Sequence, residues 1–299
     1  MRTPTRLGLY GGALVAVFAA SFATAGAVVP DEVADDWTEE TQDHDGDGHG
    51  GERSDDGAEH EAGSLGLTLE QDGYRLADVQ APREPDDDGT LSFTILDPEG
   101  AALTDFELSH EKELHLIVVR DDGEGFRHVH PERGDDGEWS VPWEWDAAGT
   151  YRVFADFVPA ATGEDATLSS TVAVAGDFEP DEAAGEVTTT EVDDFEVALD
   201  GELVAGEPST LTATVESDGE PVTSLEPYLG AYGHLVALRE EDLGYLHVHP
   251  HGDDPEPDAT SGPDVAFAAT APTPGRYLLY LDFQVDGEVH TARFVLDAR

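Results

Sequence analysis

The chain contains no cysteine, a single lysine at position 112, and methionine only at position 1. The missing thiols exclude a disulfide scaffold, a thiolate zinc knuckle, a blue-copper centre and a cysteine nucleophile. The missing internal thioether excludes a soft site for cuprous ion. Any metal that this chain binds must therefore be held by histidine and carboxylate side chains.

Positive charge is also scarce. In 299 residues, 14 lysines and arginines stand against 67 aspartates and glutamates, and the formal net charge is −53. A surface this negative repels phosphate backbones, which excludes nucleic acid as a partner. The self-repulsion is strongest in dilute buffer, where charges are poorly screened, so we expect a halophilic protein that needs salt for stability.

The N-terminal segment, residues 1–29, places two arginines before an uncharged apolar run over residues 7–29. A run of this length can cross ~30 Å of hydrocarbon as a helix, and the basic flank orients the rest of the chain outside the cytoplasm. Ala23-Thr24-Ala25 also fits a signal-peptide cleavage site. We expect a helical membrane anchor, with a cleaved signal peptide and secretion as the alternative.

Residues 30–64 are acidic and glycine-rich and contain almost no apolar side chains. Such a segment cannot bury enough surface to offset the entropy lost on ordering, which predicts a disordered linker. Its three histidines could bind metal weakly, but a charged spacer is the better interpretation.

From residue 65 onward, short runs of β-branched and aromatic residues alternate with turn clusters of glycine, proline and aspartate. No helical period extends beyond two turns. The first half predicts strands at residues 91–97, 115–120, 150–158 and 167–174. Strands this short and evenly spaced are typical of antiparallel β-sandwiches, so we expect an all-β fold class.

One pattern of histidines occurs twice. A first histidine is followed thirteen positions later by His-Val-His-Pro, and the flanking residues match in the same register. Further on, GTYRVFADF in the first half pairs with GRYLLYLDF in the second. An internal duplication explains these matches, and predicts two domains over residues 65–176 and 190–299. The repeated histidines are His115, His128 and His130, and then His234, His247 and His249.

Several segments of both halves resemble a known family: HLIVVR, HVHPERG and YRVFADF in the first half, and GHLVALRE and YLHVHP in the second. They are similar to a family of secreted or membrane-anchored bacterial proteins that are often labelled heavy-metal-binding or YtkA-like domain proteins. The resemblance covers most of the chain. It implies two tandem Ig-like antiparallel β-sandwich domains outside the cytoplasm, and it implies no established activity.

The repeated histidines are candidate metal ligands. Residues i and i+2 of a strand point to one face, so His128 and His130 project together, and His115 can join them from a neighbouring strand. The same holds for His234, His247 and His249. Three imidazoles suit Zn²⁺ or Cu²⁺ and leave one coordination position open. Asp156 and Asp282 from a later strand are candidate extra ligands, although a structural hydrogen-bonding role is the favoured interpretation for both.

A structural role for these histidines is the alternative. Histidines at strand ends often bind backbone carbonyls, a duplication copies structural residues as well as ligands, and the prolines at 131 and 250 end their strands. The sequence has no nucleophile elbow, phosphate loop or HExxH helix, and the spacing of a cupin dioxygenase fails in both copies. We therefore do not expect an enzyme.

These observations predict a non-enzymatic, extracytoplasmic binding protein that coordinates a divalent metal through the repeated histidines. Its partners would be the membrane, through the N-terminal helix, and a divalent metal or a cell-surface protein. A purely structural or adhesive cell-surface module is the first alternative. A metal-dependent enzyme of unidentified chemistry is the second.

Overall fold

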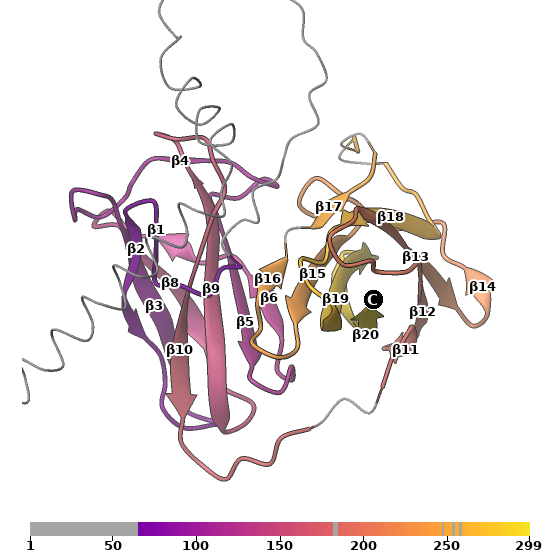
Figure 1. Ribbon diagram of the computed structural model, residues 1–299, viewed down its shortest axis with the longest axis horizontal. Helices are drawn as coiled ribbons and strands as arrows, with labels where there is room; N and C mark the ends of the chain where they lie inside the picture. The colour runs from indigo at the N-terminus through magenta and orange to yellow at the C-terminus, as the bar shows by residue number, and fades with distance from the viewer. Residues whose placement is uncertain (1–64, 182–184, 247, 253–254, 257–258) are drawn as a thin grey trace, which may run out of the picture. The chain divides into compact units, whose positions relative to one another are not determined.

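The computed structural model describes residues 65–299 except 182–184, 247, 253–254 and 257–258 (Figure 1). The expected anchor and the acidic linker lie outside the described residues. Within the described ranges every regular element is a β-strand, and no helix there is long and apolar enough to cross a membrane. The prediction of an all-β fold is confirmed for this part of the chain.

The first copy is built from two antiparallel sheets (Figure 1). One sheet has the order β1-β2-β3-β8-β7, with bounds Glu70–Gln71, Tyr74–Gln80, Gly89–Leu96, Glu138–Trp143 and Glu132–Arg133. The other has the order β10-β9-β5-β6, with bounds Ala166–Val174, Gly149–Pro159, Leu114–Arg120 and Arg127–Val129. A short strand, β4 (Phe106–Glu107), pairs with the end of β9.

The second copy repeats this arrangement. Its first sheet has the order β11-β12-β13-β18-β17, with bounds Thr189–Val192, Phe195–Asp200, Ser209–Ser217, Asp264–Ala269 and Val248–Pro250. Its second sheet has the order β16-β15-β19-β20, with bounds Tyr245–Leu246, His234–Arg239, Gly275–Val285 and Glu288–Ala298. The short β14 (Glu220–Pro221) pairs with β13.

Both copies have the strand order of an immunoglobulin sandwich. The order β2-β3-β8-β7 corresponds to A-B-E-D, and the facing order β10-β9-β5-β6 corresponds to G-F-C-C′. Each copy also has a tyrosine corner at the start of the F strand. The hydroxyl of Tyr151 donates to the carbonyl of Ala147 at 2.9 Å, and that of Tyr277 donates to the carbonyl of Thr273 at 2.8 Å.

Each sandwich buries a core of its own between its two sheets. Strand β5 is apolar on both of its faces, so that one face packs in this core and the other packs on a second surface. Leu114, Leu116 and Val118 belong to the core of the first copy, whereas the alternating residues Ile117 and Val119 belong to a third cluster. A strand buried on both faces reads as a continuous apolar run, which explains the sequence of β5.

The third cluster joins the two copies. It combines residues of β5 and β9 with residues of β15, β19 and β20. Two ring pairs lie beside it: Phe126 stacks on Tyr280 with centroids 4.0 Å apart, and Phe154 contacts Tyr245 at 5.6 Å. Phe126 matches Tyr245 and Phe154 matches Tyr280 in the repeat, so each copy contributes equivalent residues to the interface.

Candidate metal centre

The interface changes from apolar to polar at one end. The strand alternation that places Ile117 on the interdomain face also places His115 there, opposite Asp156 in the register of β5 and β9. In the second copy, His234 is likewise opposite Asp282 in the register of β15 and β19. Only 6% of His115, 8% of His234 and 3% of Asp282 is exposed. Each copy therefore buries an imidazole at this end, next to a carboxylate that is buried in the second copy and half-buried in the first.

A tight turn fixes the first histidine of each copy. The turns at residues 109–112 and 228–231 have positive φ at both central residues, which is the conformation of a type I′ turn. Each turn directs one carbonyl oxygen toward the histidine that follows. His115 Nε2 lies 2.9 Å from the carbonyl oxygen of Ser109, and His234 Nε2 lies 2.8 Å from that of Tyr228. Because a carbonyl oxygen only accepts hydrogen bonds, Nε2 of each ring carries the proton, and Nδ1 is unprotonated and presents a lone pair.

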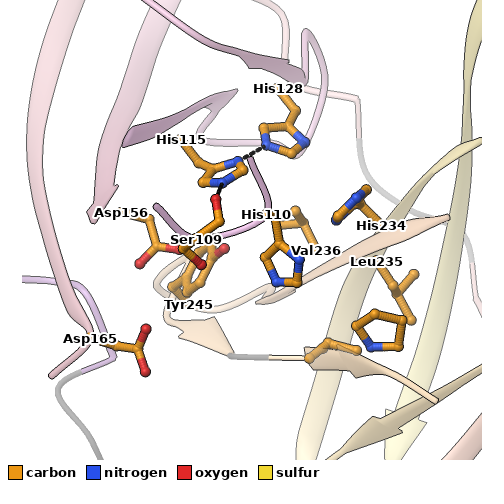
Figure 2. A pocket seen from close by; sticks show the side chains of 12 residues that line it. Ser109, His110, His115, His128, Asp156, Asp165, His234, Leu235, Val236 and Tyr245 are labelled. Carbon is orange, nitrogen blue, oxygen red and sulfur yellow. Dashed lines mark hydrogen bonds between the residues drawn. The ribbon is translucent and has the colours of Figure 1, made fainter. Parts of the chain in front are cut away.

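Three imidazoles of the first copy meet at one point. His115 Nδ1 lies 3.0 Å from His128 Nε2 and 3.1 Å from His130 Nε2. One nitrogen from each ring lies within 4.8 Å of the others. His128 reaches this point from β6, where it pairs with Ile117, and Figure 2 shows its ring facing that of His115. Sequence reasoning expected this convergence, and the structure brings these three residues together.

The outer nitrogen of His128 is held by the second copy. His128 Nδ1 lies 2.9 Å from Asp282 Oδ2, and each of these side chains is 4% exposed. The other carboxylate oxygen of Asp282 accepts a hydrogen bond from the Thr291 hydroxyl at 2.6 Å. Since an ionised carboxylate only accepts, the proton of His128 lies on Nδ1 and leaves Nε2 free as a ligand.

The electrostatics favour neutral rings for His115 and His130. Burial, followed by the neighbouring His128, lowers the pKa of His115 to about 3 and that of His130 to about 2. A single proton can satisfy only one of the two short contacts that His115 Nδ1 makes. One cation can accept lone pairs from all three nitrogens, which is the donor set of an open zinc or copper site.

The second copy is described less completely. Burial lowers the pKa of His234 to about 4. His247 lies outside the described residues, and for His249 only the backbone is described, in β17 opposite Ala268. A cluster of His234, His247 and His249 therefore stays a prediction.

The two aspartates considered as extra ligands both accept hydrogen bonds from threonine hydroxyls, in agreement with the structural role favoured for them. Asp156 accepts a hydrogen bond from the Thr167 hydroxyl at 2.8 Å. Burial, together with Asp156 beside it, raises the pKa of Tyr245 well above its usual value. Asp282 contacts a histidine of the other copy rather than of its own. Sequence reasoning missed this crossing, because nothing in the repeat indicates which residues face each other between domains.

A pocket between the copies opens beside the cluster (Figure 2). The first copy lines it with Ser109, His110, His115, His128, Asp156 and Asp165, and the second with His234, Leu235, Val236, Tyr245, Val248 and Pro250. The exposed ring of His110 lies 5.0 Å from that of His234 and 6.0 Å from that of His115, between centroids. His110 has no counterpart in the second copy, which carries Leu229 there, so the repeat did not single it out.

The sequence matches a family model described as Domain of unknown function (DUF8832), once over residues 69–176 and again over residues 190–299. The double match confirms the internal repeat. The metal-binding label implied by the earlier resemblance is not part of this description. No curated protein matches the chain.

The chain is also similar to several solved structures of bacterial proteins. The adhesin InvE of Yersinia pseudotuberculosis is 12% identical over 75% of this chain and 57% of its own, with a TM-score of 0.23. Salmonella alpha-2-macroglobulin is 16% identical over 76% of this chain and 15% of its own, with a TM-score of 0.26. Invasin, a bacterial integrin-binding protein, is 14% identical over 76% and 39%, with a TM-score of 0.22. Scores this low are not evidence of a shared activity.

Proposed function

The chain belongs to the DUF8832 family, and we propose that it is a non-enzymatic protein that binds one divalent transition-metal ion in its first sandwich. The ligands are His115 Nδ1, His128 Nε2 and His130 Nε2, and the ion is Zn²⁺ or Cu²⁺. The observation that carries this proposal is the approach of His115 Nδ1 to the other two nitrogens, at 3.0 and 3.1 Å.

The spacing of the nitrogens suits such an ion. In a tetrahedral site with bonds of ~2.0–2.1 Å, two ligand nitrogens lie roughly 3.3 Å apart. The rings of the first copy are already within a few tenths of an ångström of that separation along two of the three edges. Ser109 and Asp282 hold the outer nitrogens of His115 and His128, so both rings are oriented and in the tautomer that a ligand requires.

Three protein ligands leave a fourth position for water or for a partner's side chain. Coordination by neutral imidazole is reversible and weakens as the ligands become protonated. The protein would therefore take up or release the ion without changing it. We place the body outside the cytoplasm, on the support of the apolar run over residues 7–29 and its basic flank.

A structural or adhesive cell-surface module is the second candidate. It is favoured by the hydrogen bonds from His115 to Ser109 and from His128 to Asp282, which need no metal. In this case the cluster binds no ion and serves only to connect the two copies.

Metal titration separates the two candidates. The full chain, purified in molar salt, is titrated with Zn²⁺ and with Cu²⁺ against a competing chelator, beside a His130→Asn variant and a matched His251→Asn control. His130 makes its short contact within the cluster, whereas His251 is exposed and outside it. We expect one tight equivalent to be lost in His130→Asn and kept in His251→Asn. Equal uptake by all three proteins would reject the metal site and leave the structural candidate.

A further inference from the structure

We infer that Asp282 of the second sandwich is a positioning residue for the metal centre of the first, so that ion binding and docking of the two sandwiches stabilise each other. This inference rests on the proposed function. It concerns a residue that lies in another domain from the ligands, 154 positions along the chain from His128.

The contact has the geometry of an outer partner of a metal ligand. Asp282 Oδ2 lies 2.9 Å from His128 Nδ1, on the side of the ring opposite to the ligand nitrogen. The Thr291 hydroxyl binds Oδ1 at 2.6 Å and holds the carboxylate in place. A carboxylate bound to the outer nitrogen of a ligand histidine fixes the tautomer, orients the ring and raises its basicity.

The matching carboxylate of the first copy has no described contact with the ligands of this cluster. Asp156 stands opposite His115 in the register of the same sheet, but its carboxylate binds the Thr167 hydroxyl at 2.8 Å. Thr167 and Thr291 occupy matching positions, since each is the cross-strand partner of its aspartate. The two aspartates are therefore held alike, and only Asp282 reaches a ligand of the described cluster.

Charge gives the contact a second consequence. Asp282 is 3% exposed, and its described partners are an imidazole and a hydroxyl. A buried carboxylate is costly unless positive charge compensates it. A dication on Nε2 of His128 supplies that charge through the ring. The ion therefore favours the arrangement in which Asp282 stays docked against the first sandwich.

The remainder of the interface can hold the sandwiches together without the ion. Ile117, Val119 and Val236 are among the buried residues of the shared apolar cluster, and the Tyr280 hydroxyl donates to the carbonyl of Gly123 at 2.6 Å. The ion thus adds to an interface that already exists. Because coupling between two equilibria is reciprocal, docking tightens ion binding by the same factor by which the ion tightens docking.

The test uses the full chain with His247→Asn and His249→Asn as the parent protein. These substitutions remove two of the three candidate ligands of the second copy, so His115, His128 and His130 remain as the complete set. Asp282→Asn is introduced in this parent, and Asp156→Asn serves as the matched control. We expect Asp282→Asn to raise the Kd for Zn²⁺ by roughly 10–100-fold, and Asp156→Asn to leave it unchanged. The visible spectrum of bound Co²⁺ should also change only in Asp282→Asn, because a ring in the wrong orientation alters the ligand field.

Docking is measured through a buried reporter. The chain has no cysteine, so Val119→Cys at the apolar interface gives a single thiol whose labelling reports undocking. Zinc should slow labelling in the parent and have no effect with Asp282→Asn. The Asp282→Asn protein also serves as a control for zinc bound to the thiol itself, because such binding would slow labelling with and without this substitution.

The outcomes separate the inference from the function on which it rests. A parent that takes up no tight equivalent of Zn²⁺ overturns the proposed function. A parent that binds, with Asp282→Asn equal to it in Kd and labelling, overturns only the inference. If Asp282→Asn fails to fold, Thr291→Val loosens the same carboxylate without removing its charge. That variant should weaken binding severalfold, and unchanged affinity would also overturn the inference.

Discussion

The two copies share the histidine motif but differ in how the backbone carries it. In the first copy, His128 and Val129 still pair with β5, so the motif stays in the sheet that faces the second sandwich. In the second copy, the described pairs with β15 include Leu246, and Val248 pairs with β18 in the opposite sheet. The valine of the motif His-Val-His-Pro thus pairs with a different sheet in each copy, Val129 with β5 and Val248 with β18.

The preceding histidines show no such difference. His115 and His234 follow the same type of turn, face the same interface and donate to equivalent carbonyls. Duplication has therefore kept the anchoring of the first histidine in both copies. In the first copy two further rings converge on His115, and Asp282 contacts one of them, which a bond to a backbone carbonyl does not explain. In the second copy, His247 and the side chain of His249 lie outside the described part of the chain.

The largest expected effect is on the free energy of unfolding, and it is tested by substituting one histidine in each copy. His128→Asn removes the partner of Asp282 and leaves a buried carboxylate uncompensated, which should lower the free energy of unfolding by about 3 kcal/mol. His234→Asn removes one hydrogen bond to a carbonyl and should cost about 1 kcal/mol. Urea unfolding in chelator and molar salt measures both. Equal losses would mean that the contact with Asp282 adds nothing.

A second prediction concerns pH. The pKa values of His115, His130 and His234 are lowered from 6.5 to about 3, 2 and 4, so below pH 6.5 the unfolded chain binds more protons than the folded one. Stability is then full above this pH and falls as the pH drops toward the folded values. In chelator, the thermal midpoint should decrease from pH 7.5 to 5.

Single substitutions in each copy provide the control for the pH prediction, because two of these three rings belong to the first copy and one to the second. His130→Asn and His234→Asn should each make the decrease shallower by removing one ring that titrates only after unfolding. A midpoint that stays constant over this range, or a slope that neither variant changes, would contradict the burial of neutral rings.

The smallest expected effect is one that the copies should share. Tyr151→Phe and Tyr277→Phe each remove the hydroxyl of a tyrosine corner, with hydrogen bonds of 2.9 and 2.8 Å. Each variant should lose about 1 kcal/mol of unfolding free energy, because one buried hydrogen bond is lost without a cavity. Clearly unequal losses would indicate that the two sandwiches are not equivalent in their frameworks.

Much of this could be predicted from the sequence because the signals are local or repeated. Strand alternation and turn residues indicated the sheets, and the spacing of His115, His128 and His130 indicated a shared face. The interface between the copies has a weaker signal, the continuous apolar run of β5, whose two-sided burial was not recognised. The contact between Asp282 and His128 has no signal in the sequence, because it depends on how one whole domain packs against the other.

The most direct test is a crystal structure of the full chain grown with Zn²⁺, with anomalous scattering collected at the zinc edge. We predict one peak at ~2.0–2.1 Å from His115 Nδ1, His128 Nε2 and His130 Nε2, with the carboxylate of Asp282 still bound to the outer nitrogen of His128. A zinc-soaked protein with no peak among these rings, and with the rings hydrogen-bonded to one another instead, would contradict the account.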